Sequence, residues 1–203
     1  TSFYEEADNS TLWGLFVSAG YLTVTKVIDP KKGIFRIEIP NYEVRREFIN
    51  LTEYQLGMNN GQFDRIIDSL IDENKKEFLK NYQNVLMIPS YQDLNNENSY
   101  HMMMLGMCLC LSDNYKIISN REEGKGRCDL IIQAKDENKT SFVLEFKYLK
   151  EEKKNIQEEL NKLSNEAIQQ SKDRRYDYDL KGRVIYIGLA HHGKDVMMKW
   201  VER

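Results

Sequence analysis

The sequence is poor in cysteine and has no cysteine motif. Its three cysteines are Cys108, Cys110 and Cys128, an odd number with no C-x-x-C pair, and this excludes a simple disulfide framework. Two of them lie in an apolar, methionine-rich stretch, where buried free thiols are expected. We therefore predict a reduced, intracellular protein with a cytoplasmic location.

Long apolar segments are also lacking. No run reaches the ~20 residues that a membrane helix needs, and no stretch has the character of a signal peptide. The chain begins with Thr1 rather than Met, so we expect it to be a piece of a longer protein.

There is no surplus of basic charge. Lys and Arg total 29 against 32 Asp and Glu, for a formal net charge of -3. This charge balance argues against a strongly basic nucleic-acid binder. It does not exclude an enzyme with one local basic groove. The sequence does have 41% hydrophobic residues in 203, enough for a packed core in one large domain or two small ones.

Residues 1–60 are predicted to form a small winged-helix-like unit. Apolar residues at helical spacing indicate a helix over 11–19, and strand-like runs over 21–28 and 34–39 flank a turn with both Pro and Gly. A second helix follows Pro40. The lysines of the turn suit a solvated loop better than a nucleic-acid contact.

Residues 61–90 are predicted to be a connector, with one amphipathic helix over 61–80. The remaining unit, 91–203, shows the order α-β-β-β-α-β, which implies a mixed sheet with helices on its faces. Its predicted elements are a helix over 97–111, strands over 115–119, 127–134 and 141–149, a helix over 152–178 and a strand over 183–190. The tail, 194–201, is expected to be a last helix.

Three charged residues in the second unit point to chemistry. Glu145 and Lys147 are two residues apart on a strand and so share one face, whereas Phe142, Leu144 and Phe146 take the other. Asp129 lies on the adjoining strand, where the hairpin register can bring it beside Glu145. Two carboxylates at a strand edge suit Mg²⁺ or Mn²⁺. A plain salt bridge involving Lys147 is the competing explanation.

The motifs G-R-C-D-L, V-L-E-F-K and E-A-I-Q-Q-S-K-D-R-R-Y, in this order, resemble the PD-(D/E)xK nuclease domain. This domain is found at the C-terminus of many bacterial proteins that begin with an AAA-type ATPase-like region. The helix before the sheet matches too, through Glu97, Tyr100 and His101. The first unit, with L-W-G-L and I-P-N, is similar to the end of that ATPase-like region.

The resemblance implies a restriction-endonuclease-like α/β fold and a role for each matching residue. Asp129 and Glu145 would bind the metal, and Glu97 would reach it from the first helix. Lys147 would position water or phosphate. Gln170 would hold the site or a phosphate, while Arg175 and Tyr176 would contact the nucleic-acid backbone.

Basic residues near these motifs are candidate nucleic-acid contacts. Lys125 and Arg127 flank the site and could draw phosphate in. Lys172, Arg174 and Arg175 form a basic run, which suits a phosphate-contacting helix face and a solvated helix face about equally well.

Other features favour structural readings. His101 lies in a methionine-rich helix and is expected to be a core residue, and His191 and His192 are expected in a surface loop, without the further ligands that zinc needs. No G-x-x-x-x-G-K-[ST] loop occurs, so we expect no nucleotide binding by this chain.

The sequence therefore predicts a metal-dependent nuclease that hydrolyses phosphodiester bonds, with DNA as the expected substrate from the resemblance. Its alternative is a non-catalytic module that binds nucleic acid or a partner, as the output domain of an ATPase-linked regulatory protein. Fold alone does not separate the two.

Overall fold

The computed structural model describes residues 9–55, 57–59, 61–88, 94–111, 114–123, 126–150 and 154–203. The chain consists of two compact units, 1–48 and 49–203. None of the helices in the described part of the chain has the length and apolar character of a membrane-spanning segment.

The first unit contains α1 (Asn9–Ser18), β1 (Thr23–Asp29), β2 (Ile34–Glu38) and the start of α2 (Tyr42–Gln55). The predicted order of helix, hairpin and helix is confirmed, whereas a winged-helix relationship stays a prediction. The hairpin turn is closed by Asp29, whose Oδ1 accepts hydrogen bonds from the amides of Lys31 and Lys32. Asn41 caps α2 by accepting the Val44 amide at 2.9 Å.

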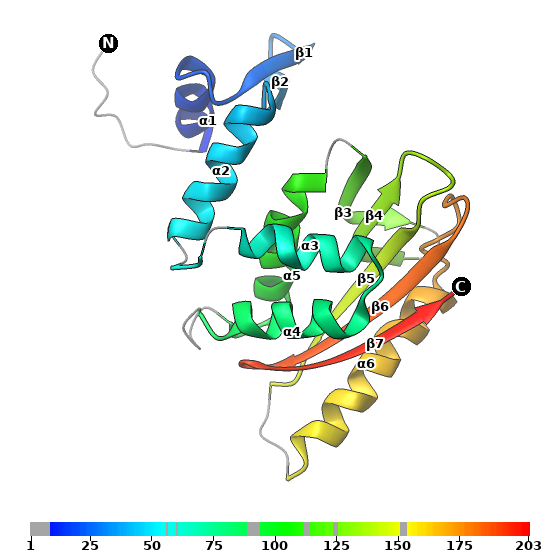
Figure 1. Cartoon of the computed structure of the whole chain (residues 1–203). Helices are drawn as coiled ribbons and strands as arrows, with labels where there is room; N and C mark the ends of the chain where they lie inside the picture. Colours follow the sequence, from blue (N-terminus) through cyan, green and yellow to red (C-terminus); the bar gives the residue numbers. More distant parts are fainter. Residues whose placement is uncertain are drawn as a thin grey trace. The chain divides into compact units, whose positions relative to one another are not determined.

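The second unit is built on a five-stranded sheet in the order β3-β4-β5-β6-β7 (Figure 1). Its strands are β3 (Tyr115–Glu123), β4 (Gly126–Ala134), β5 (Ser141–Tyr148), β6 (Val184–His192) and β7 (Asp195–Glu202). Adjacent strands are antiparallel except β5 and β6, which are parallel, as a connection through α6 (Ile156–Asp173) requires. The predicted αβββαβ order is confirmed, as is the antiparallel pairing of the 127–134 and 141–149 runs.

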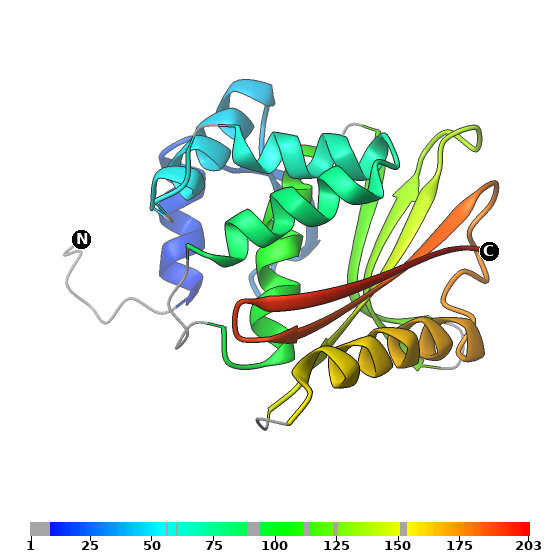
Figure 2. The ribbon, with the colours of Figure 1, turned by 60° about the horizontal axis from the view of Figure 1, so that its bottom comes forward.

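Helices cover both faces of this sheet (Figure 2). One face packs against α3 (Gln62–Ile71), α4 (Lys75–Leu86) and α5 (Glu97–Met107), which is followed by a short 3₁₀ helix, Cys108–Leu111. The other face is covered by α6, which packs on β5, β6 and β7. Because both faces are covered, β5 and β6 are buried along nearly their whole length.

Side-chain alternation along β5 sorts its residues between the two faces, as predicted. Phe142, Leu144 and Phe146 are fully buried in the core shared with α3, α4 and α5. Val143 belongs to the smaller apolar cluster on the α6 face. Since alternate residues of a strand share a face, Glu145 lies on the α6 side.

The expected last helix over 194–201 is wrong, because this segment is strand β7. Gly193, with φ 55°, forms a tight turn after β6, and the chain returns antiparallel from Asp195 to Glu202. Apolar side chains of β7 join clusters on both faces of the sheet, so its sequence lacks the polar-apolar alternation that marks a half-buried strand.

Other boundaries also differ from those that the sequence predicts. The expected single connector helix is two helices, α3 and α4, separated at Glu73, which has a left-handed φ of 56°. Both pack in the core of the second unit. Helix α6 starts after its cap Asn155 and ends at Asp173, well inside the expected 152–178.

His191 is not in a surface loop, because β6 extends through it. Its side chain is fully buried, stacked on Tyr100 with ring centroids 3.9 Å apart. Its Nε2 forms a 2.9 Å hydrogen bond with the Tyr82 hydroxyl. Burial lowers the pKa of His191 to about 3, so this ring is a neutral core group that ties α4 and α5 to the sheet. His101 is also buried, as expected, with Nε2 2.9 Å from Ser119 Oγ.

Candidate active site

Strands β4 and β5 stop pairing where their charged residues begin. In the β4–β5 register Leu130 lies opposite Leu144, and one step further this register brings Asp129 opposite Glu145. Here the Asp129 side chain replaces a backbone partner, since its Oδ2 accepts the Phe146 amide at 2.9 Å. The sheet thereby holds two carboxyl groups side by side at the point where two strands diverge.

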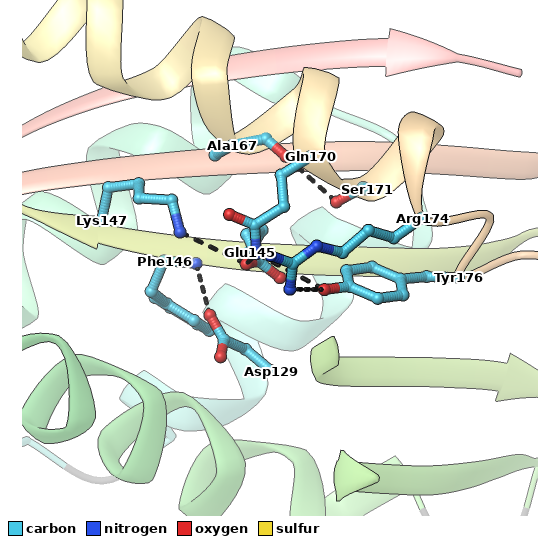
Figure 3. A network of polar contacts seen from close by, with 9 residues as sticks. All are labelled: Asp129, Glu145, Phe146, Lys147, Ala167, Gln170, Ser171, Arg174 and Tyr176. Atoms are coloured by element: carbon cyan, nitrogen blue, oxygen red, sulfur yellow. Dashed lines mark hydrogen bonds and ion pairs between the residues drawn. The ribbon is translucent and has the colours of Figure 1, made fainter. Parts of the chain in front are cut away.

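Glu145 is the most constrained group of the site, with only 1% of its surface exposed. Its Oε1 accepts hydrogen bonds from Lys147 Nζ at 3.3 Å and from Gln170 Nε2. Its Oε2 is buried without a hydrogen-bond partner of good geometry among the described residues. Figure 3 shows this carboxyl between Lys147 on one side and the α6 side chains on the other.

The pKa of Glu145 is raised to about 7, first by burial and then by the nearby charge of Asp129. Lys147 acts in the opposite direction, and so, to a smaller extent, does the backbone amide of Asp129. The net shift is upward because desolvation of a buried carboxylate outweighs a single cation that is itself partly solvated. Glu145 therefore holds its proton more tightly than an exposed glutamate.

Glu97 lies in the first turn of α5, close enough to Lys147 and Asp129 for their charges to affect its pKa. The helix starts there because the Asn96 side chain caps it by accepting the Ser99 amide at 3.1 Å. Partial burial raises the pKa of Glu97, Lys147 lowers it and Asp129 raises it again. These influences indicate that the Glu97 carboxyl lies near both residues.

The donor set fits a hard divalent cation. Glu145 offers an unpartnered buried oxygen, and Asp129 uses only Oδ2 in its bond to Phe146. Among the described residues, no cluster of three His, Cys, Asp or Glu side chains has the geometry to hold a metal by itself. Two carboxylates suffice for Mg²⁺, which usually retains waters and shares phosphate oxygens of a substrate.

Helix α6 positions Gln170 over Glu145. Its close approach depends on Gly188, which pairs with Glu145 in the β5–β6 register. A Cβ atom at Gly188 would lie 2.3 Å from the Ser164 carbonyl oxygen and 3.0 Å from Ala167 Cβ. Only glycine leaves room for the helix at this distance, and the sequence offers a signal for it in a lone glycine within a buried strand.

Tyr176 lies beneath Gln170 rather than at the surface. Its ring is 2% exposed and belongs to the apolar cluster on the α6 face. Its hydroxyl accepts hydrogen bonds from Gln170 Nε2 at 3.4 Å and from Arg174 Nη1 at 3.3 Å. This burial makes Tyr176 a support for its neighbours, and leaves its ring unable to stack on a base.

Two of the basic residues named from the sequence, Lys172 and Arg175, are described, and neither is directed at Glu145. Lys172 and Arg175 are exposed at the end of α6, and each lies over an aromatic ring, Lys172 over Tyr186 at 5.7 Å and Arg175 over Tyr178 at 5.1 Å. Lys125 and the Arg127 side chain lie outside the described residues. Arg174 is the basic residue of this run that is directed at the site, and the sequence analysis gave it no role apart from the run.

The order of elements and the residues gathered here are those of a known family. A family model for the PD-(D/E)XK nuclease superfamily matches residues 95–201, which is more than half of the chain. The chain belongs to the PD-(D/E)XK nuclease superfamily. Its second unit has a mixed α/β structure that is consistent with the restriction-endonuclease-like fold of that superfamily. No curated protein matches the chain significantly.

Proposed function

We propose that the chain is a metal-dependent nuclease that hydrolyses phosphodiester bonds, with DNA as its substrate. The observation that carries this proposal is the buried Glu145 carboxyl, which lies next to both Asp129 and Lys147 and has one oxygen without a well-placed hydrogen-bond partner in the described part of the chain. A buried carboxylate without compensation costs several kcal/mol. A bound cation would compensate this cost, which explains a buried carboxylate at this position.

Asp129 and Glu145 are the proposed ligands of Mg²⁺ or Mn²⁺, and Glu97 is a third acid that can reach the ion through water. A divalent cation held there would stabilise charge on the phosphate oxygens and make a water more acidic. Lys147, which is 19% exposed at its side chain and paired to Glu145, would hold the phosphate or the attacking water in line.

Gln170 is proposed to keep Glu145 oriented. Its amide donates to Glu145 Oε1, and the Tyr176 hydroxyl holds the same amide from behind. When a cation takes the Glu145 oxygens, the Gln170 amide remains available as a donor to a phosphate oxygen. Tyr176 acts on the reaction through Gln170, because its ring is buried.

Nucleic acid is proposed to approach over the end of α6 and the start of β4. Lys125, Arg127, Lys172 and Arg175 would contribute longer-range attraction to the phosphate backbone. Such a local basic region is compatible with the net charge of -3, because steering depends on the local field and less on the total.

The non-catalytic alternative has one specific observation in its favour. In the described residues Glu145 already has partners in Lys147 and Gln170, and no cluster of three ligands is present. A module of this kind would bind nucleic acid or a protein on behalf of an upstream ATPase-like domain, with residues 1–60 as the link and 61–90 as the connector. The two proposals differ in whether the chain cleaves nucleic acid.

The test is a cleavage assay on single- and double-stranded DNA and RNA with Mg²⁺, Mn²⁺ or EDTA. We expect cleavage of DNA with either ion, no cleavage with EDTA, and at least a hundredfold loss in Glu145→Gln, as is usual when a group acting on the transition state is removed. Glu166→Gln, the same chemical change at an exposed position of α6, is the matched control.

The non-catalytic alternative would be favoured if the wild-type chain cleaves none of the four substrates although circular dichroism shows that it is folded. Equal rates for the Glu145 and Glu166 variants would instead mean that a different site, or a contaminant, performs the cleavage.

A further inference from the structure

Three basic residues at the end of α6 point in three directions. The ammonium of Lys172 lies 5.7 Å from the centroid of the Tyr186 ring, and the guanidinium of Arg175 lies 5.1 Å from that of Tyr178. Arg174 instead donates from Nη1 to the Tyr176 hydroxyl at 3.3 Å. Of the three, Arg174 is therefore the one whose charge faces the carboxyl groups.

The backbone at the end of α6 explains this direction. The Arg174 amide still completes the helix by donating to the Gln170 carbonyl at 3.1 Å. Arg175 then adopts a left-handed φ of 55°, which turns the chain back and inserts the Tyr176 ring into the core below. The Tyr176 hydroxyl consequently holds Gln170 and Arg174 next to each other, on the Glu145 side of β5 (Figure 3).

Arg174 carries a permanent positive charge at the site. The hydrogen bond to Tyr176 raises the pKa of Arg174, and the charge of Glu145 raises it further, so the guanidinium is always protonated. It is exposed to solvent, and its bond to Tyr176 uses one of five N–H donors. A planar fork of N–H groups that is exposed beside a cation site matches the oxygens of a phosphate better than any other common ligand.

We propose that Arg174 binds a backbone phosphate of the nucleic acid next to the bond that is cleaved. This inference rests on the proposed function and adds to it the anchor for the substrate strand. Arg174 holds the phosphate from the α6 side, while Lys147 approaches from β5, so the strand is bound between the helix end and the sheet edge. Lys172 and Arg175, which lie over rings, contribute only longer-range attraction.

The test uses the salt dependence of binding, because each phosphate contact releases counterions. Binding of a short fluorescein-labelled DNA, as a duplex and as a single strand, is measured by anisotropy over a series of KCl concentrations, with Ca²⁺ present and intact DNA verified on a gel. The plot of log K against log salt has a negative slope. Losing one phosphate contact makes this slope less steep, by about 0.9 for duplex and about 0.7 for a single strand.

We expect this reduced slope in Arg174→Ala, together with a roughly tenfold weaker affinity. Arg174→Lys keeps the charge and should keep the slope while losing affinity, since lysine lacks the planar fork. Arg65→Ala, which removes an exposed arginine of α3 on the face of the sheet opposite α6, is the matched control and should keep the wild-type slope. Cleavage by all variants is measured in parallel with Mg²⁺.

An Arg174→Ala variant that has the wild-type slope and wild-type affinity would overturn the inference. So would a variant that cleaves poorly with an unchanged slope, because this pattern means that Arg174 only supports Tyr176 and Gln170. If the wild-type chain neither binds nor cleaves DNA or RNA, the proposed function fails and the inference with it. If the wild-type chain cleaves and the Arg174 variants bind and cleave as it does, the inference about Arg174 is refuted while the proposed function stands.

Discussion

Replacing Glu145 by glutamine should change how stability depends on pH. Glutamine has nearly the shape of a protonated glutamate, so Glu145→Gln preserves the packing and removes only the ionisation. The wild-type carboxyl is 1% exposed, and burial raises its pKa from 4.5 to about 7. The variant therefore isolates the cost of placing a negative charge at this position.

The size and sign follow from the two pKa values. Below about pH 4.5 the carboxyl is protonated in both folded and unfolded chains and has no effect. As the pH rises toward about 7, the unfolded chain loses this proton while the folded chain keeps it, so the folded state becomes less favoured. At 1.36 kcal/mol per pKa unit, a pKa raised from 4.5 to about 7 costs about 3 kcal/mol above neutrality.

Urea unfolding in metal-free buffer, from about pH 4.5 to about pH 8, measures this cost. The free energy of unfolding of the wild type should fall relative to that of Glu145→Gln by up to about 3 kcal/mol over this range. Other groups, His191 among them, titrate in both proteins and cancel in the difference. Adding Mn²⁺ at high pH should restore stability to the wild type only, since a cation compensates the ionised carboxyl.

This reasoning would be refuted if the difference in unfolding free energy between the wild type and Glu145→Gln stayed constant with pH. It would mean that Glu145 is ionised throughout as a salt bridge with Lys147. In that case Glu145→Gln should be the less stable protein at every pH, because it leaves the Lys147 charge without its buried partner.

Two other predictions concern the packing that supports the site. Gly188→Ala should destabilise the fold by about 1–3 kcal/mol and reduce cleavage, since its Cβ would lie 2.3 Å from the Ser164 carbonyl oxygen and displace α6. Gly106→Ala, where no neighbouring atom lies within 4 Å, should raise the melting temperature, and the reverse order in thermal melts would refute this account of α6. His191→Gln should lose less stability in acid than the wild type, because the buried ring, with its pKa lowered to about 3, stays neutral while the unfolded chain is protonated. Circular dichroism during acid titration would contradict this if both proteins unfolded in parallel.

The core of the site could be predicted because strand geometry is regular. Glu145 and Lys147 interrupt an apolar run at a spacing of two, which fixes their common face. Asp129 follows from the antiparallel hairpin, which closes through the turn at Asp136, Glu137 and Asn138. Glu97 and Gln170 came from the family resemblance, since no local rule brings two helix positions to one strand edge.

The remaining features depend on tertiary structure. Strand β7 has apolar side chains on both faces, so its sequence is compatible with a helix. The family resemblance made Tyr176 a candidate contact for nucleic acid, whereas the left-handed turn at Arg175 buries its ring. The same turn directs Arg174 to the site. A left-handed arginine has no reliable sequence signal, because the conformation is costly for non-glycine residues and arises from the surrounding packing.

Calorimetric titration with Mn²⁺ tests most directly whether the carboxyl pair holds a cation. The wild-type chain should bind the ion at one site near neutral pH, with binding lost in both Glu145→Gln and Asp129→Asn and retained in the exposed control Glu166→Gln. The account is contradicted if the wild type shows no heat of binding either alone or with DNA present, or if both carboxyl variants bind Mn²⁺ as the wild type does.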